Sequence, residues 1–323
     1  MGTYKGIQGY LVETLSSDPT ASENVGKLWY NTTSNTWKVA KEGSGAWSSG
    51  PDVNSSKMRG GGCGIQTAAI AYGGDDSALA ETYNGTAWTE VADLNTARSN
   101  IGAAGQAPQT TALGFGGSPP TAGLAVTEQY NGSCWTEVED LNTARKSAAS
   151  FGTSTAAVMA AGQVPGGTIN KAEVEEYNGS CWTEVTNIPV AVREPTGGGI
   201  LTSGLVFGGY VTGAVATTTE YDGTNWSAGA DLNTARHAMG GAGATQTATL
   251  AFGGEGPTSD GKETELYNGT CWTALGDLAT GRGTGAGVGI STAALYISGT
   301  PPTFVETEEW NSPNYEAATV TTS

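Results

Sequence analysis

The sequence of 323 residues predicts an all-β protein, a six-bladed β-propeller. Three observations lead to this prediction. A motif seen in full at residues 81–98 recurs along most of the chain, each period holds four runs of strand length, and the last period lacks a strand that the N-terminal region supplies. Periods of this size are typical of solenoids and propellers.

The third and fourth runs of each period carry the clearest signal. Each repeat has a tyrosine followed five residues later by a tryptophan, and successive tryptophans are 47, 47, 44 and 46 residues apart. The pairs are Tyr83/Trp88, Tyr130/Trp135, Tyr177/Trp182, Tyr221/Trp226 and Tyr267/Trp272. Asn-Gly or Asp-Gly stands within each pair. These dipeptides accept the positive φ angles of a tight turn and predict a β-hairpin.

The first and second runs predict the inner strands. A stretch rich in glycine and alanine follows each repeat's arginine, and an apolar run ending in glycine comes next, as at 111–117, 204–209 and 248–254. No amphipathic helical stretch competes with these runs. A small-residue first strand fits the crowded centre of a propeller, where neighbouring blades approach closely.

The two ends of the repeat region are complementary. After Arg282 the chain offers runs at 293–299 and 306–311 but no fourth strand, whereas 44–54, around Trp47, aligns with the fourth strand of the other repeats. We therefore expect the strand around Trp47 to complete the C-terminal blade, which removes an open sheet edge. Residues 41–323 are assigned to the propeller and 1–40 to an N-terminal attachment segment. That segment contains a predicted hairpin of 27–31 and 36–39, whose inclusion would make seven blades.

Two parts of the chain resemble known proteins. The Gly-Gly after the second strand, the tyrosine of the third and the tryptophan of the fourth resemble the kelch repeat. This resemblance implies architecture rather than activity, because one fold hosts many functions. Residues 26–39, GlyLysLeuTrpTyrAsnThrThrSerAsnThrTrpLysVal, resemble a short module near the start of bacteriophage tail-fibre and other virion proteins. That resemblance implies a virion protein made in the host bacterial cytoplasm without a signal peptide.

Composition narrows the classes of partner. Lysine and arginine total 14 against 31 acidic residues, which gives a net charge of −17. Such an acidic surface repels phosphate, so nucleic acid and anionic membranes are not expected partners. No apolar run reaches the length of a membrane span, and the first 20 residues lack a signal-peptide core.

Candidates for catalysis or metal binding are few. The single histidine, His237, is expected to be structural or exposed. Three cysteines stand at one repeat position and are expected to be free thiols like Cys63, because equivalent sites on different blades lie too far apart for a disulfide. These are Cys134, Cys181 and Cys271. We expect no metal, no cofactor and no catalysis.

Six arginines and the loops between second and third strands are the candidate sites. The arginines are expected to form a pseudo-sixfold ring with a structural role, the alternative being an anion or sugar-acid site. They are Arg59, Arg98, Arg145, Arg193, Arg236 and Arg282. The variable loops should share one face with them, as expected of a binding rim. The rim candidates are the aromatics Tyr210 and Phe304 with the charged residues Asp75, Asp76, Asp260 and Lys262.

These features favour one function over two alternatives. The favoured hypothesis is a non-enzymatic bacteriophage virion protein of the tail-fibre or adhesin type. In it, the N-terminal segment binds other virion proteins and the propeller rim binds a host surface glycan or protein. The first alternative is a structural virion or assembly protein that docks onto neighbouring subunits. The second is a carbohydrate-active enzyme, which requires a carboxylate pair that the sequence does not single out.

Overall fold

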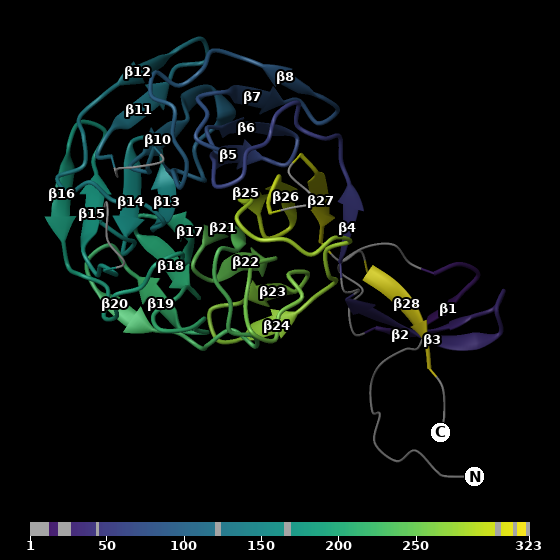
Figure 1. Ribbon diagram of the computed structural model, residues 1–323. Coiled ribbons are helices and arrows are strands. Elements are labelled where there is room, and N and C mark those ends of the chain that lie inside the picture. The colour runs from purple at the N-terminus through teal and green to yellow at the C-terminus, as the bar shows by residue number, and fades with distance from the viewer. Residues whose placement is uncertain are drawn as a thin grey trace. The chain divides into compact units, whose positions relative to one another are not determined.

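The computed structural model describes residues 13–18, 27–42, 45–119, 124–164, 169–300, 305–312 and 315–320. The chain divides into two compact units (Figure 1). The larger is Ala46–Asn311, and the smaller combines Met1–Gly45 with Ser312–Ser323. The described residues form seven four-stranded sheets and one short 3-10 helix, Gln109–Thr111. Six of the sheets lie in the larger unit and the seventh in the smaller one.

The larger unit is a ring of sheets, numbered 1 to 6 here in chain order (Figure 1). Sheet 1 is β5 (Gly61–Ile65), β6 (Ala68–Tyr72), β7 (Ala80–Tyr83) and β8 (Trp88–Glu90). Sheet 2 is β9 (Gly102–Ala103), β10 (Leu113–Phe115), β11 (Thr127–Tyr130) and β12 (Trp135–Glu137). Sheet 3 is β13 (Ala149–Thr153), β14 (Ala156–Ala160), β15 (Val174–Tyr177) and β16 (Trp182–Val185).

The second half of the ring has the same plan. Sheet 4 is β17 (Thr196–Ile200), β18 (Ser203–Phe207), β19 (Thr218–Tyr221) and β20 (Trp226–Ala228). Sheet 5 is β21 (Gly240–Thr245), β22 (Ala248–Phe252), β23 (Thr264–Tyr267) and β24 (Trp272–Ala274). Sheet 6 is β25 (Ala286–Ile290), β26 (Ala293–Ile297), β27 (Thr307–Asn311) and β4 (Ala46–Ser49).

The first strands of these sheets contact one another in cyclic order, from β5 through β9, β13, β17, β21 and β25 back to β5. Sheet 6 joins the two ends of the repeat region, because β4 pairs antiparallel with β27 and Trp47 lies opposite Trp310. The ring centroid of Trp47 lies 4.9 Å from that of Phe252 and 5.5 Å from that of Trp310. The sequence prediction of an all-β propeller is confirmed.

Glycine-rich first strands are explained by how closely the sheets approach at the centre. A Cβ added to Gly287 on β25 would lie 2.5 Å from both the backbone nitrogen and the carbonyl oxygen of Gly241 on β21. Real Cβ contacts are longer than this, so a side chain there would push two sheets apart. Small residues on the first strands are therefore required for the ring to close.

Aromatic side chains fill the space between neighbouring sheets. An aromatic ring on the second strand packs edge-on against the blade tryptophan of the next sheet, as in Tyr72–Trp135 at 4.8 Å and Phe207–Trp272 at 5.0 Å. Edge-to-face contacts of this kind add to the stabilisation from burial. The hydrophobic core is thus a series of inter-sheet layers around the axis.

The smaller unit has its own sheet, in the order β1 (Glu13–Leu15), β2 (Leu28–Asn31), β3 (Thr36–Glu42) and β28 (Tyr315–Thr319). Its β2–β3 hairpin corresponds to the hairpin expected at 27–39, with Leu28 opposite Val39. The sequence division into 1–40 and 41–323 needs adjustment at both ends. The units separate after Gly45, and β28 hydrogen-bonds along β3 instead of joining the ring. Among the described residues, no helix is long and apolar enough to span a membrane.

Candidate functional site: the axial ring and the rim of sheet 4

One face of the ring carries both groups of loops that the sequence analysis singled out. In four of the sheets, a bridge of β type links the fourth-to-first connection to the following second-to-third connection, as in Ser99 with Ser118 and Arg193 with Tyr210. The same pairing recurs between His237 and Glu255. The face that carries these loops is called the rim below.

Four of the six predicted arginines occupy one buried position in the repeat. Arg98, Arg145, Arg236 and Arg282 each form an ion pair with a glutamate on the third strand of the sheet that their loop enters. The partners are Glu128, Glu175 at 2.9 Å, Glu265 at 2.7 Å and Glu308 at 2.5 Å. Because both members of each pair are buried, these arginines join consecutive sheets and are not available to an outside ligand.

Arg59 and Arg193 do not belong to this set, so the prediction of six equivalent arginines is wrong at two positions. Sheet 1 uses Lys57, whose Nζ lies 2.7 Å from Glu81, and both side chains are buried. In sheet 4 the same repeat position is held by Val192, which is buried and uncharged. The buried position is always the fifth residue after the aspartate or asparagine that precedes it, and only this spacing distinguishes Val192 from Arg193.

Two residues further along each loop lies a second repeated position, whose six residues surround the axis of the ring. We call this set the axial ring. It consists of Arg59, Asn100, Ser147, Glu194, Ala238 and Thr284. All six have positive φ angles, between 51° and 62°. Backbone hydrogen bonds connect neighbouring members: the N–H of Arg59 donates to the Thr284 carbonyl at 2.7 Å, and the N–H of Glu194 donates to the Ser147 carbonyl at 2.8 Å.

The axial ring holds its side chains in a costly backbone conformation. A left-handed conformation costs a residue other than glycine about 1–2 kcal/mol, and a β-branched residue such as Thr284, at φ 59°, is a clear outlier. Elsewhere in the repeat most positive-φ sites are glycines, as at Gly73 and Gly208, although Ala161 and Ser298 hold the same repeat position in sheets 3 and 6. Residues retained in strained conformations are concentrated at functional sites. The conformation therefore marks the axial ring as a candidate site.

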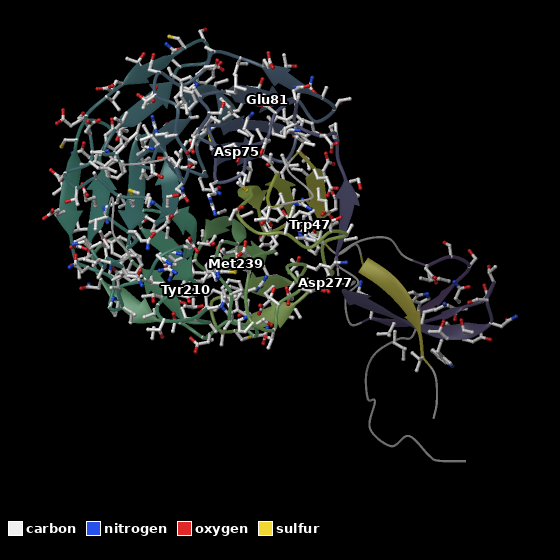
Figure 2. The ribbon with its side chains drawn as sticks, in the orientation of Figure 1. Trp47, Asp75, Glu81, Tyr210, Met239 and Asp277 are labelled. Carbon is white, nitrogen blue, oxygen red and sulfur yellow. The ribbon has the colours of Figure 1, made fainter. Side chains whose placement is uncertain are left out.

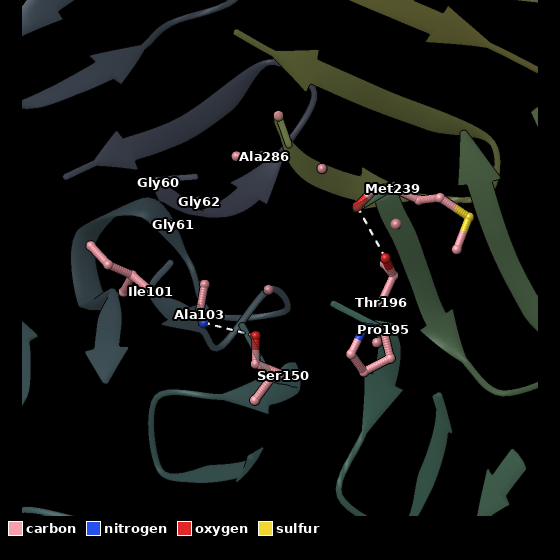
Figure 3. Close-up of a pocket in the computed structure, with 16 residues that line it drawn as sticks. Gly60, Gly61, Gly62, Ile101, Ala103, Ser150, Pro195, Thr196, Met239 and Ala286 are labelled. Carbon is pink, nitrogen blue, oxygen red and sulfur yellow. Dashed lines mark hydrogen bonds between the residues drawn. The ribbon is translucent and has the colours of Figure 1, made fainter. Parts of the chain in front are cut away.

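The axial ring surrounds a pocket of about 100 Å³ that leads into the central channel. A second pocket of about 140 Å³ shares part of this lining and is walled by glycine and alanine, by the polar Ser150 and Thr196, and by the apolar Ile101, Pro195 and Met239 (Figure 3). There the Ser150 hydroxyl accepts a hydrogen bond from the Ala103 N–H, and the Thr196 hydroxyl donates to the Met239 carbonyl. Deeper still, the Gln106 amide donates across the channel to the Gly289 carbonyl at 3.1 Å.

Charged side chains enter this region only at its mouth. Of the described residues that line the axial pocket and channel, Arg59 and Glu194 are the ionisable ones. Among the described residues that wall the channel there is no pair of carboxylates of the kind that glycoside hydrolysis requires. The ionisable groups of this region therefore lie at the mouth of the axial pocket.

A cluster on the rim of sheet 4 adjoins the axial ring at Glu194. The guanidinium carbon of Arg193 lies 4.2 Å from the ring centre of Tyr210. Tyr210 in turn packs edge-on against His237 at 5.3 Å. His237 Nδ1 lies 2.8 Å from Glu194 Oε2. Tyr210 is therefore half-buried between Arg193 and His237 (Figure 2).

The charges around Glu194 determine its protonation. Its pKa lies below the ordinary value of 4.5, chiefly because His237 hydrogen-bonds to the carboxylate. Burial opposes this lowering, and electrostatic interactions with His237, then Arg193 and Arg59, reinforce it. Glu194 is consequently a carboxylate at neutral pH, next to two cations at the mouth of the pocket.

The remaining predicted rim residues lie away from the axial pocket. Asp75 and Asp76 are exposed on the rim of sheet 1, where Asp76 accepts a hydrogen bond from the Ser99 hydroxyl at 2.7 Å. Asp260 is exposed in sheet 5 and accepts from the backbone N–H of Lys262 at 3.0 Å. Phe304 lies outside the described residues. None of the described four lines the axial pocket, so the structure does not gather them into one site.

Comparison with known proteins supports the fold and goes no further. The sequence matches no protein-family model and no curated protein. Solved structures do match, among them one titled "Structure of YjhT", with a TM-score of 0.67 and 14% sequence identity over 84% of this chain and 97% of that chain. YjhT has a β-propeller-type fold with four-stranded sheets. At this identity the likeness establishes the fold class: the larger unit is a β-propeller.

Proposed function

We propose that this protein is a non-enzymatic virion component of a bacteriophage, of the tail-fibre or adhesin type. Its six-sheet ring is interpreted as a six-bladed kelch-like propeller closed by β4. The axial ring binds a glycan on the host surface, and the smaller unit attaches the propeller to other virion proteins. The protein is made in the host cytoplasm and resides in the virion.

The axial ring is the observation that carries this proposal. Six equivalent backbone positions hold six different residues in a strained conformation around one pocket. If the positions served only ring closure, glycine would satisfy them at lower cost. A rigid frame that displays dissimilar side chains at one mouth is the arrangement expected of a binding site.

The side chains of the axial ring favour a sugar as the ligand. Arg59 supplies hydrogen-bond donors and Glu194 supplies acceptors. Asn100 and Ser147 supply both, and the Ser147 hydroxyl donates to the Asn100 side chain at 3.1 Å. The Thr284 hydroxyl is buried and does not contribute to this set. Sugar hydroxyls likewise both donate and accept. The 100 Å³ pocket limits contact to the terminal unit of a glycan, with the rim loops available to the next unit.

The smaller unit offers a surface suited to attachment. Leu28 lies opposite Val39 and Tyr30 lies opposite Trp37, so these four side chains share one face of its sheet. Trp37 is 45% exposed and Leu28 is 36% exposed. Large apolar side chains grouped on an exposed face mark protein interaction sites.

The proposal is tested by a pull-down with the full chain and with residues 46–311. Each is incubated with candidate host cells, with their extracted polysaccharides and with disassembled virions. Binding of both forms to cells or polysaccharide, with capture of virion proteins by the full chain alone, supports the proposed division of labour. Capture of virion proteins without any binding to cells favours a structural role. Release of glycan fragments overturns the non-enzymatic assignment.

A further inference from the structure

Sheet 4 contains a pocket where the other five sheets of the ring hold a buried ion pair. Val192 replaces the arginine or lysine, and Thr219 replaces the glutamate. Pro189 replaces the asparagine that, in four of the sheets, hydrogen-bonds to the same glutamate. All three replacements line a pocket of about 190 Å³.

The pocket coincides with the space that the guanidinium fills elsewhere. In sheet 5 the Arg236 guanidinium donates to the carbonyls of Gly253 and Glu263. The sheet 4 residues at these repeat positions are Gly208 and Thr217, and both line the pocket. The pocket therefore occupies the space that a charged side chain fills in the other sheets, and the shorter side chains of sheet 4 border it.

The walls of this pocket are apolar. Ile188 and Val192 are each 5% exposed, and Val206 is 3% exposed. Pro189 and Val190 form an exposed apolar lip, with Val190 51% exposed, and Asp231 stands at the edge. A charged group inserted here would lose its hydration without gaining the glutamate partner present in the other sheets. An apolar group would replace water against aliphatic walls.

We propose that this pocket binds a small neutral apolar molecule of about the size of a benzene ring. An apolar protein cavity of about 150 Å³ is large enough to hold benzene or xenon, and the sheet 4 pocket exceeds that volume while opening to the surface. The site is separate from the axial ring, because the two pockets share no lining residue. It is a second binding site, whose ligand class differs from a sugar.

The test is a titration of the full chain with benzene, followed by ¹³C-methyl NMR. We expect saturable shifts of the Ile188, Val192 and Val206 methyl groups, with no saturable shift of the Val288 methyls, which are buried between sheets 6 and 1. Guanidinium ion serves as the opposite probe and is expected to leave the same three residues unshifted. Failure of benzene to bind, or binding of guanidinium in its place, overturns the proposal.

Two variants link the binding to this pocket. The triple variant Pro189→Asn/Val192→Arg/Thr219→Glu rebuilds the network of the other sheets and is expected to weaken benzene binding at least about tenfold. Val192→Phe fills the pocket with an apolar ring and tests the same point without new charge. Wild-type benzene affinity in a folded form of either variant would show that the molecule binds elsewhere and would refute the assignment.

Discussion

Sheet 4 and the other five sheets of the ring solve the same packing problem in different ways. In sheet 2, Arg98 enters from the preceding loop and pairs with Glu128 on β11, and both side chains are fully buried. In sheet 4 the same two positions hold Val192 and Thr219, and a pocket remains beside them. Both members of the pair changed, and neither sheet leaves a charge buried alone.

The difference teaches that the buried pair behaves as a unit. Removing one partner leaves an uncompensated charge in the interior, whereas replacing both with apolar or neutral groups is often tolerated. The replacement in sheet 4 also coincides with the rim cluster, since Arg193, Glu194 and Tyr210 lie on loops of the same sheet. Sheet 4 is thus the part of the ring that lacks the buried ion pair and carries a cluster of charged and aromatic side chains on its rim.

The largest expected effect comes from breaking a pair in sheet 2. Glu128→Gln should lower the free energy of unfolding by about 3–5 kcal/mol, because it leaves the Arg98 guanidinium buried without a counter-charge. The matched change in sheet 4, Thr219→Val, should alter it by less than about 1 kcal/mol. Urea denaturation of both variants measures the difference. Equal costs would mean that the ion pair contributes nothing specific to sheet 2.

A double-mutant cycle in sheet 4 tests the pairing by introducing the arginine and the glutamate into a sheet that has neither at these two positions. Val192→Arg alone should destabilise by about 2 kcal/mol, since the new guanidinium lacks the buried glutamate partner of the other sheets and is only partly hydrated in the open pocket. Adding Thr219→Glu should recover most of this loss, with a favourable coupling of about 1–3 kcal/mol. Denaturation of the two single variants and the double variant gives the coupling. A coupling near zero would show that sheet 4 cannot rebuild the pair of its neighbours.

A smaller effect on stability should distinguish glycine substitution in the axial ring from glycine substitution at an ordinary strand position. Thr284→Gly should stabilise the protein by about 1 kcal/mol, because glycine removes the left-handed strain of a β-branched residue. Thr89→Gly, at an exposed position of β8, should instead lose up to about 1 kcal/mol. Thermal unfolding of both variants provides the comparison. A loss of stability in Thr284→Gly would remove the argument that these side chains are kept for function.

The smallest effect is a pH dependence confined to the rim of sheet 4. Because the folded-state pKa of Glu194 is lowered below 4.5, its stabilising contribution is present above pH 4.5 and is lost as the pH falls through the lower, folded-state pKa. The stability difference between wild type and Glu194→Gln should therefore be constant at higher pH and shrink in this acidic range. His237→Ala should move the Glu194 titration, followed by NMR, toward higher pH. An unchanged titration would refute the role assigned to His237.

The sequence pattern predicted those features that repeat within a short stretch of chain. The tyrosine–tryptophan hairpins, the glycine-rich inner strands and the joining of Trp47 to the C-terminal sheet all follow from local spacing and strand count. The pairing of β28 with β3 was missed, because residues 312–323 carry no repeat signal and their partner lies more than 270 positions away.

The site was predictable only in part. Arg59 and Arg193 were assigned to the buried position because residue type was followed instead of the five-residue spacing from the preceding aspartate or asparagine, which leads to Lys57 and Val192. The axial ring gave no compositional signal, since its six members are chemically unrelated and share only a backbone conformation. Aligning the repeats two residues beyond the buried cation would have identified the set.

Glycan binding at the axial ring is tested most directly by the affinity of purified full chain for host surface polysaccharide, measured by titration calorimetry. Arg59→Ala and Glu194→Gln should each weaken binding at least about tenfold without loss of folding. The matched controls Lys171→Ala, which removes a cation paired with Glu173 outside the axial pocket, and Glu90→Gln, at an exposed position of β8, should bind as wild type does. Unchanged affinity in both axial-ring variants would contradict the proposed site.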